Sequence, residues 1–212
     1  MEYMKQNQSM ASKLRIVTNK SITLVFFLLF PATLAVAQDD QGPDYGDILQ
    51  GFADPARWLT YSGDYSGQRH SPLTQINTDN VASLRPVWTF QTGTTTRGRG
   101  FETTPLVDDG VLYVTGSNNY AWAIDARTGR RFWQYRRNLP DDLTYGASAP
   151  VNRGFGMLGN RLFMVTLDAH LLAFDRRNGE ILWDVELADY RVGYAATGAP
   201  LWEYDPQVPG ET

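Results

Sequence analysis

The sequence predicts an all-β fold built from propeller blades, and two observations support this prediction. First, AIDARTGRRFW (Ala123 to Trp133) and AFDRRNGEILW (Ala173 to Trp183) are near repeats fifty residues apart. Second, short runs of alternating apolar and polar residues precede and accompany both copies, as in half-buried strands. A unit of about 40 to 50 residues that repeats in this way is typical of a propeller blade, which needs neighbouring blades to bury both of its faces.

The strands and turns of each unit follow from aligning Val107 with Met157 without gaps. Alternation with a period of two predicts strands at VLYV and AWAID in the first unit and at LFMV and LLAFD in the second. Turn residues lie between them at Asp108-Asp109-Gly110, Thr128-Gly129, Gly159-Asn160 and Asn178-Gly179. Asn-Gly and Thr-Gly pairs supply the positive φ of a tight hairpin. Each unit is therefore predicted to be a meander of about four strands.

A tryptophan follows the second turn of each unit, at Trp133 and Trp183. Trp88, in PVWTFQTG, lies 45 residues before Trp133 and predicts the closing strand of a preceding unit. A large apolar residue at one fixed position can fill the gap between neighbouring blades. Packing is the expected role of all three tryptophans.

The first 37 residues have the pattern of a signal peptide. Four basic residues precede the apolar run Ile22 to Phe30, and Ala35-Val36-Ala37 is a small-residue cleavage site. The apolar run is shorter than the ~20 residues that a bilayer span needs, so no stable membrane anchor is expected. Cleavage after Ala37 and a periplasmic location are predicted. Residues 38–55 are predicted to be a lead-in, and the polar stretch QDDQGPDYGD within it is expected to be mobile.

Composition excludes several classes of partner and site. Without the leader the chain has 15 basic and 22 acidic residues, a net charge of −7, which disfavours nucleic acid and anionic membrane surfaces. Because the chain has no cysteine, it cannot form a disulfide, hold a metal through thiolates or attach haem covalently. His70 and His170 stand apart with no second ligand pattern, so neither is expected to bind a metal.

The stretch WLTYSGDYSGQRHSPLTQINTDNVASLRPVWTFQTG (Trp58 to Gly93) is more specific than a strand pattern. It resembles the opening of the quinoprotein alcohol dehydrogenases, periplasmic oxidoreductases that use pyrroloquinoline quinone (PQQ) and a calcium or lanthanide ion. The resemblance continues through GRGFETTPLVDDG, PVNRG and GYAATGAPL. It implies that residues 56–212 form the first two to three blades of an eight-bladed propeller. It also implies an alcohol substrate and a cytochrome c or quinone electron acceptor.

Three cofactor contacts are implied by motifs of that family. The glutamate of its E-x-T-P motif matches Glu102, the arginine of V-N-R-G matches Arg153, and the threonine of A-T-G-A-P matches Thr197. The resemblance implies that all three contact PQQ, with Arg153 pairing with a carboxylate, a role that suits its planar fork of donors.

Two features of the family are missing from this sequence. Many members place adjacent cysteines before V-N-R-G, where this chain has Ala147 and Ser148. The family's catalytic aspartate and its metal ligands fall beyond this chain, so no catalytic residue and no metal ligand is assigned. The carboxylates Asp125, Asp168 and Asp175 occupy hairpin positions and are expected to stabilise turns.

The carboxy-terminal residues predict an abnormal or truncated propeller after about residue 201. Trp202 follows Trp183 by only 19 residues, although a blade needs about 40 to 50. The chain alone is therefore expected to be inactive in alcohol oxidation. Two alternatives stay open: a non-catalytic periplasmic scaffold propeller, and a decayed gene product that does not fold.

Overall fold

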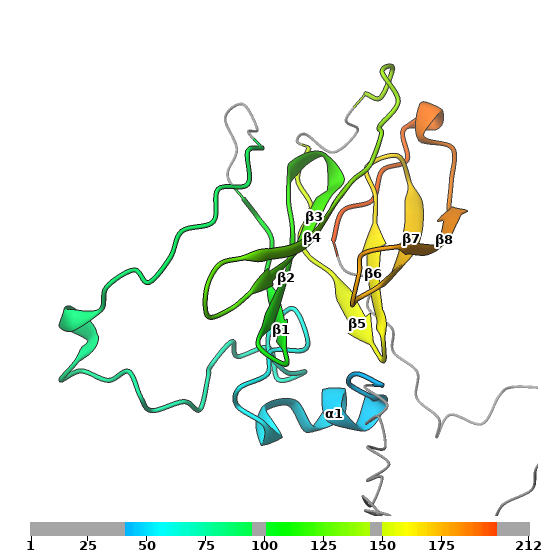
Figure 1. Cartoon of the computed structure of the whole chain (residues 1–212). Helices are drawn as coiled ribbons and strands as arrows, with labels where there is room; N and C mark the ends of the chain where they lie inside the picture. Colours follow the sequence, from blue (N-terminus) through cyan, green and yellow to red (C-terminus); the bar gives the residue numbers. More distant parts are fainter. Residues whose placement is uncertain (1–40, 95–100, 145–149, 199–212) are drawn as a thin grey trace, which may run out of the picture. The chain divides into compact units, whose positions relative to one another are not determined.

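Two four-stranded antiparallel sheets form the centre of the computed structural model (Figure 1). The structure describes residues 41–94, 101–144 and 150–198. The first sheet contains β1 (Leu106–Asp108), β2 (Val111–Thr115), β3 (Tyr120–Asp125) and β4 (Arg131–Arg136). The second contains β5 (Gly156–Leu158), β6 (Arg161–Val165), β7 (His170–Asp175) and β8 (Ile181–Glu186). In both sheets the strands pair in sequence order, so each sheet is a simple meander. The all-β prediction and the two four-stranded units are confirmed.

The two sheets are copies of one pattern, because each strand of the second begins and ends fifty residues after its counterpart. Even the irregularities repeat. The pairing register shifts between Ala123 and Ile124 in the first sheet and between Ala173 and Phe174 in the second. Such a shift inserts one extra residue in the outer strand and increases the local twist.

The hairpins that close β3 onto β4 and β7 onto β8 have the predicted turn chemistry. Gly129 and Gly179 have φ values of 72° and 77°, in the left-handed region that favours glycine. Asp125 Oδ1 accepts hydrogen bonds from the backbone amides of Arg127 (2.8 Å) and Thr128 (3.1 Å). In the same way, Asp175 Oδ1 accepts a hydrogen bond from the backbone amide of Arg177 (2.9 Å). The expected turn role of these two carboxylates is confirmed.

Each of two tryptophans joins its own segment to the hairpin of the next sheet. The Trp133 indole N–H donates to the carbonyl of Arg176 at 2.9 Å, and a Cβ on Gly179 would lie 2.7 Å from the indole. The Trp88 indole donates to the carbonyl of Ala126 at 3.0 Å and covers Gly129 as closely. Trp88 therefore has the position of a closing-strand tryptophan. Its segment, residues 84–94, is nevertheless extended without being part of a strand among the described residues.

The core lies between and beneath the two sheets and is rich in aromatic rings. Trp133 stacks on Phe174 with ring centroids 6.4 Å apart and planes 8° apart. Phe155 meets Phe174 edge to face at 5.7 Å. The apolar residues buried around them come from both sheets and from the segment before them: Ile48, Leu59, Leu106, Tyr113, Ala121, Ala123, Met157, Leu162, Met164 and Leu172. Burial of this surface between sheets is what a single blade cannot achieve alone.

A buried ion network ties the β1–β2 hairpin to the second sheet. The Arg176 guanidinium binds Asp108, and the side chains of both are almost wholly buried. Arg57 Nε donates to the other oxygen of Asp108 at 2.7 Å. Burial would lower the pKa of Arg57, but the charge and hydrogen bond of Asp108, together with the charges of Asp47 and Asp109, outweigh it and raise that pKa. One carboxylate thus holds two arginines from segments far apart in sequence.

The described part of the lead-in, from residue 41, folds against the second sheet, contrary to the mobility expected there, and residues 38–40 lie outside the described residues. Asp44 and Asp47 form a reciprocal capping box at the start of α1 (Tyr45–Gln50), which continues into the short 3₁₀ helix η1 (Gly51–Ala53). The carbonyl of Pro43 accepts a hydrogen bond from the amide of Gly159 at 2.7 Å, and Ile48 is buried. The prediction of a mobile segment was wrong because it considered only the polarity of these residues and not their capping and tertiary contacts. The predicted signal peptide, residues 1–37, lies outside the described residues.

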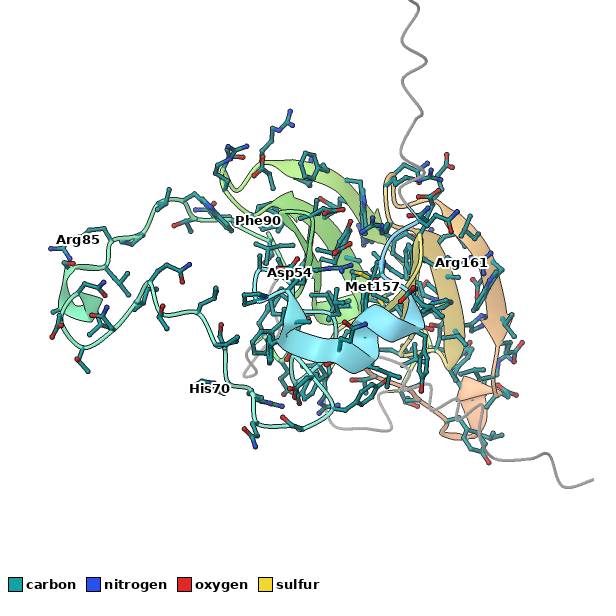
Figure 2. All side chains as sticks on the ribbon, turned by 90° about the horizontal axis from the view of Figure 1, so that it is seen from below. Asp54, His70, Arg85, Phe90, Met157 and Arg161 are labelled. Atoms are coloured by element: carbon teal, nitrogen blue, oxygen red, sulfur yellow. The ribbon has the colours of Figure 1, made fainter. Side chains whose placement is uncertain are left out.

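An extended arm runs from the lead-in to Trp88 and carries the 3₁₀ helix η2 (Val81–Ser83) (Figure 1). Figure 2 shows His70 and Arg85 on this arm, directed away from the sheets. Two more 3₁₀ helices, η3 (Ser117–Asn119) and η4 (Tyr190–Val192), lie after β2 and β8. Within the described ranges, no helix has the length and apolar character needed to cross a bilayer.

Candidate cofactor-binding site

The three residues singled out by their motifs meet at one point of the structure. Arg153 Nη2 lies 3.0 Å from Glu102 Oε2, and Arg153 Nη1 donates to the Thr197 hydroxyl at 3.1 Å. These residues come from three segments: the approach to β1, the approach to β5, and the chain after η4. Arg153 is the centre of the group, and 47% of its side chain is exposed, against 31% for Glu102.

Backbone contacts fix Glu102 beside Arg153. The amide of Thr104 donates to the carbonyl of Arg153 at 3.2 Å, so the segments before β1 and β5 run in contact. The hydroxyls of Thr103 and Thr115 share a hydrogen bond of 2.9 Å, which anchors the Glu102 segment to the end of β2. These contacts place the carboxylate at the end of the sheet opposite the β1–β2 hairpin.

The segment before β5 crosses from the first sheet to the second and explains the residues of its motif. The amide of Asn118 donates to the carbonyl of Pro150 at 2.9 Å, which attaches the segment to the first sheet. Gly154 has a φ of 132°, and a Cβ there would lie 3.0 Å from the carbonyl oxygen of Thr104. Only glycine allows this approach without strain, so the Arg153 side chain emerges from a backbone held on both sides.

Thr197 is held by the end of β6. The amide of Val165 donates to the carbonyl of Gly198 at 3.4 Å, and the amide of Ala196 donates to the carbonyl of Thr166 at 3.3 Å. These bonds flank Thr197 on both sides in sequence. Its hydroxyl is thereby directed at the Arg153 guanidinium, 44 residues away along the chain.

The arrangement offers a solvent-accessible, oriented cation. A guanidinium presents its donors in a plane that matches a carboxylate or phosphate, and Glu102 and Thr197 set the direction of that plane here. Because an ion pair as exposed as this contributes only about 0 to 1 kcal/mol to stability, its contribution to folding is small. A group of this kind can bind an anionic ligand.

A second polar cluster joins the sheets and was missed by the reasoning from sequence. Arg137, just after β4, donates through Nε to both carboxylate oxygens of Asp168 at 2.7 and 2.8 Å, and through Nη1 to Asp184 at 2.8 Å. His170 Nδ1 lies 2.6 Å from Asp184 Oδ1. Asp168 lies in the β6–β7 turn and bonds to Thr166, as its expected turn role requires, but its carboxylate also binds Arg137, which follows the other sheet. No local sequence signal marks this contact, which spans 31 residues.

Arg137 keeps both aspartates of this cluster ionised. Burial would raise the pKa of Asp168, but the hydrogen bonds and charge of Arg137, with a hydrogen bond to Thr166, hold it below its ordinary value. The same competition lowers the pKa of Asp184, with a further contribution from His170. Burial would lower the pKa of Arg137, but the bonds to Asp168 and Asp184 raise it. With its charges paired internally, the cluster functions as a cross-link between sheets.

No metal centre is formed by the part of the chain that the structure describes. Within residues 41–94, 101–144 and 150–198, no three His, Cys, Asp or Glu side chains gather in a group that could hold an ion. His70 is exposed and His170 pairs with Asp184. Ala147, Ser148 and the segment after Gly198, including Trp202, lie outside the described residues.

Paired four-stranded meanders joined by tryptophans define the class of protein as a β-propeller. Residues 58–187 match the family described as PQQ, glucose/ethanol/alcohol dehydrogenase, beta-propeller domain. The chain therefore belongs to this family of quinoprotein dehydrogenase propellers.

Curated relatives and solved structures agree with this assignment. The chain is 48% identical over 143 residues to the 1-butanol dehydrogenase (quinone) of Thauera butanivorans, covering 68% of this chain and 23% of that protein. It is 39% identical over 181 residues to the quinoprotein alcohol dehydrogenase PedH of Pseudomonas putida, covering 85% and 29%.

Among solved structures, a europium-containing methanol dehydrogenase superimposes with a TM-score of 0.69 at 34% identity, covering 76% of this chain and 28% of that one. The quinohemoprotein alcohol dehydrogenase of Comamonas testosteroni gives 0.66 at 33% identity, covering 76% and 24%. The chain thus spans about a quarter of the length of these relatives.

Proposed function

We propose that this chain is the amino-terminal part of a periplasmic PQQ-dependent dehydrogenase that oxidises alcohols, and that Glu102, Arg153 and Thr197 contact the cofactor. The observation that supports this most is the meeting of three motif residues, far apart in sequence, around one half-exposed guanidinium. Family membership supplies the cofactor class.

The residues present fit PQQ, a planar quinone that carries three carboxylates. Arg153 offers a fork of donors to one carboxylate, and the Thr197 hydroxyl lies beside that fork as a further donor. Because acidic residues outnumber basic ones in the chain as a whole, an anionic ligand needs a local cation to offset repulsion. Glu102 keeps the guanidinium oriented towards the open edge.

Bound PQQ would supply the two-electron acceptor for the alcohol. The residues of this chain bind and orient the ligand: Arg153 and Thr197 hold its acidic edge, and Glu102 contacts it and also positions Arg153. Calcium or lanthanide ligands, the catalytic aspartate and the contact with cytochrome c or a quinone acceptor belong, in this proposal, to further parts of the protein. Export would follow from the leader at residues 1–37.

A binding titration with the 212-residue chain tests the proposal. PQQ should quench the tryptophan fluorescence of the wild type, and Arg153→Ala should weaken binding at least about tenfold, the equivalent of 1.4 kcal/mol. Arg153→Lys should recover part of the affinity, because an ammonium keeps the charge but loses the fork. The matched control is Arg161→Ala, since Arg161 is an exposed arginine on β6 (Figure 2). Equal affinities for all four proteins would refute the assignment.

An activity assay addresses the chain on its own. We expect no dye-linked alcohol oxidation from the purified chain supplied with PQQ and calcium, since the proposal assigns no catalytic base to it. Turnover that depends on added PQQ would contradict this expectation and would require a base within these 212 residues.

A further inference from the structure

One buried side chain beside Arg153 bonds to the strand end that also holds Thr197 and to the turn after β2. Asn152 immediately precedes Arg153 and is 1% exposed. Its Nδ2 donates to the carbonyl of Val165 at 2.9 Å and to Asn119 Oδ1 at 3.3 Å, and its Oδ1 accepts from the amide of Gly154 at 3.1 Å. A single amide therefore bonds to both sheets and to the backbone on the far side of Arg153.

The hydrogen bond to Val165 connects Asn152 with the segment that contains Thr197. Val165 accepts from Asn152 through its carbonyl and donates through its amide to Gly198, directly after Thr197. The strand end that fixes Thr197 is thus the strand end that fixes Asn152. These two bonds act together with the direct bond between Arg153 and Thr197 to set the relative placement of the two residues.

The hydrogen bond to Asn119 connects Asn152 to the turn between β2 and β3 of the first sheet. Asn118 and Asn119 both have positive φ, near 55°, a conformation that asparagine tolerates better than most residues. This kink buries the Asn119 side chain, whose Nδ2 has no hydrogen-bond partner within the described residues. A buried donor without a partner costs free energy, so the kink keeps Asn119 oriented as an acceptor for Asn152 at the expense of its own amide.

We propose that Asn152 is the positioning residue of the site: its buried amide holds the Arg153 guanidinium within reach of Thr197 and Glu102. The inference rests on the proposed function for the identity of the ligand, but the ordering of Arg153 is a property of the chain alone. Asn152 acts through Arg153, and we do not assign it contact with the cofactor.

The direct test measures the mobility of Arg153 by NMR in the 212-residue chain without ligand. The order parameter of its Nε–Hε bond should approach the rigid value of about 0.85 in the wild type and fall below about 0.6 in Asn152→Ala. Asn152→Ser should give an intermediate value, because a hydroxyl can still accept from Gly154 but cannot reach both Val165 and Asn119. An Arg153 that stays rigid in a folded Asn152→Ala protein would overturn the proposal.

Leu162→Ala is the control for loss of stability. Leu162 is fully buried in β6 and has no bond to the Asn152 amide, so this variant should lower the thermal midpoint and leave Arg153 ordered. Equal disorder of Arg153 in Leu162→Ala would show a merely structural role for Asn152. If both Asn152 variants fail to fold, the wild type is measured instead. A mobile Arg153 Nε–Hε bond in the wild type would overturn the proposal. A rigid Arg153 together with slow exchange of the Asn152 side-chain protons would support it.

PQQ titration separates this inference from the proposed function. Asn152→Ala should bind PQQ about tenfold more weakly than wild type, and Leu162→Ala should bind as wild type does. A wild type that does not bind PQQ but loses Arg153 order on mutation of Asn152 would refute the cofactor and retain the positioning role. Unchanged PQQ affinity in Asn152→Ala would refute the positioning role and retain the cofactor.

Discussion

Two arginine–carboxylate groups lie at opposite ends of the β1 and β5 strands, and they differ in burial. At the hairpin end, 2% of the Arg176 side chain and 1% of the Asp108 side chain are exposed, and the carboxylate is shared with Arg57. At the other end, Arg153 and Glu102 remain about half and one third exposed. The first group stabilises the contact between sheets. The second is exposed and contributes little to stability, and the proposed function assigns it to ligand binding.

The largest effect is expected from breaking the buried group. Asp108→Ala leaves Arg57 and Arg176 without their shared counter-charge and should lower the free energy of unfolding by about 3 to 5 kcal/mol, measured by urea denaturation. Asp109→Asn is the neighbouring control, because that carboxylate is 75% exposed and lies 3.8 Å from Arg176, and asparagine tolerates the positive φ of this position. If both variants were equally stable, burial would not be the property that distinguishes the two ends.

A second effect concerns the tryptophan joint at the hairpin end. Gly179→Ala adds both the strain of a positive φ and a clash with the Trp133 indole, and should cost about 2 to 4 kcal/mol. Gly110 has a similar φ of 70° with nothing within 4 Å of an added Cβ, so Gly110→Ala should show only the strain, about 1 to 2 kcal/mol. Thermal denaturation of the two variants measures the contribution of the clash. Equal midpoints would mean that the indole moves aside.

Acid should weaken the Arg137 cross-link. The folded-state pKa values of Asp168 and Asp184 are lowered, so their stabilisation is present above the unfolded value near 4 and is lost as pH falls through the folded values. Arg137→Met removes the hydrogen bonds and the charge that contribute most to this lowering. The difference in unfolding free energy between wild type and this variant should therefore shrink as pH falls from about 5 to 3. A difference that stays constant over this range would contradict the ionised pairing.

The smallest stability effect is expected at the exposed end. Arg153→Ala should change the free energy of unfolding by less than about 1 kcal/mol, measured under the conditions used for Asp108→Ala. The same variant should lose PQQ affinity, so stability and binding separate at this residue. A loss of stability comparable to that of Asp108→Ala would assign Arg153 to the fold.

The strands were predictable because periodicity, turn residues and a repeat of fifty all indicated the same meander. The helix α1 was not, because its capping box uses two aspartates in a polar stretch and its anchor, Pro43 on Gly159, is a tertiary contact. The three site residues could be named from their motifs. Their meeting could not, since it depends on the pairing of Val165 with Gly198, which no local pattern encodes.

Arg137 and Asn152 show a second reason why part of the polar network could not be predicted from the sequence. Arg137 is one of several arginines near the end of β4, and only the packed sheets distinguish it by its contact with Asp168. Asn152 stands inside the V-N-R-G motif, where the neighbouring arginine is the more conspicuous residue. The motif itself was the signal that could have identified it.

The tryptophan joints have a consequence for how such chains evolve. Trp88 lies on Gly129 and Trp133 on Gly179, so each pair couples residues of successive repeats. A substitution that enlarges the glycine avoids the clash only when the indole before it becomes smaller, while the strain of the positive φ remains. Across related sequences, we expect the tryptophan of one repeat to covary with the glycine of the next more closely than with any residue of its own repeat. In such a propeller, the pair of residues that changes together in evolution then belongs to two successive repeats.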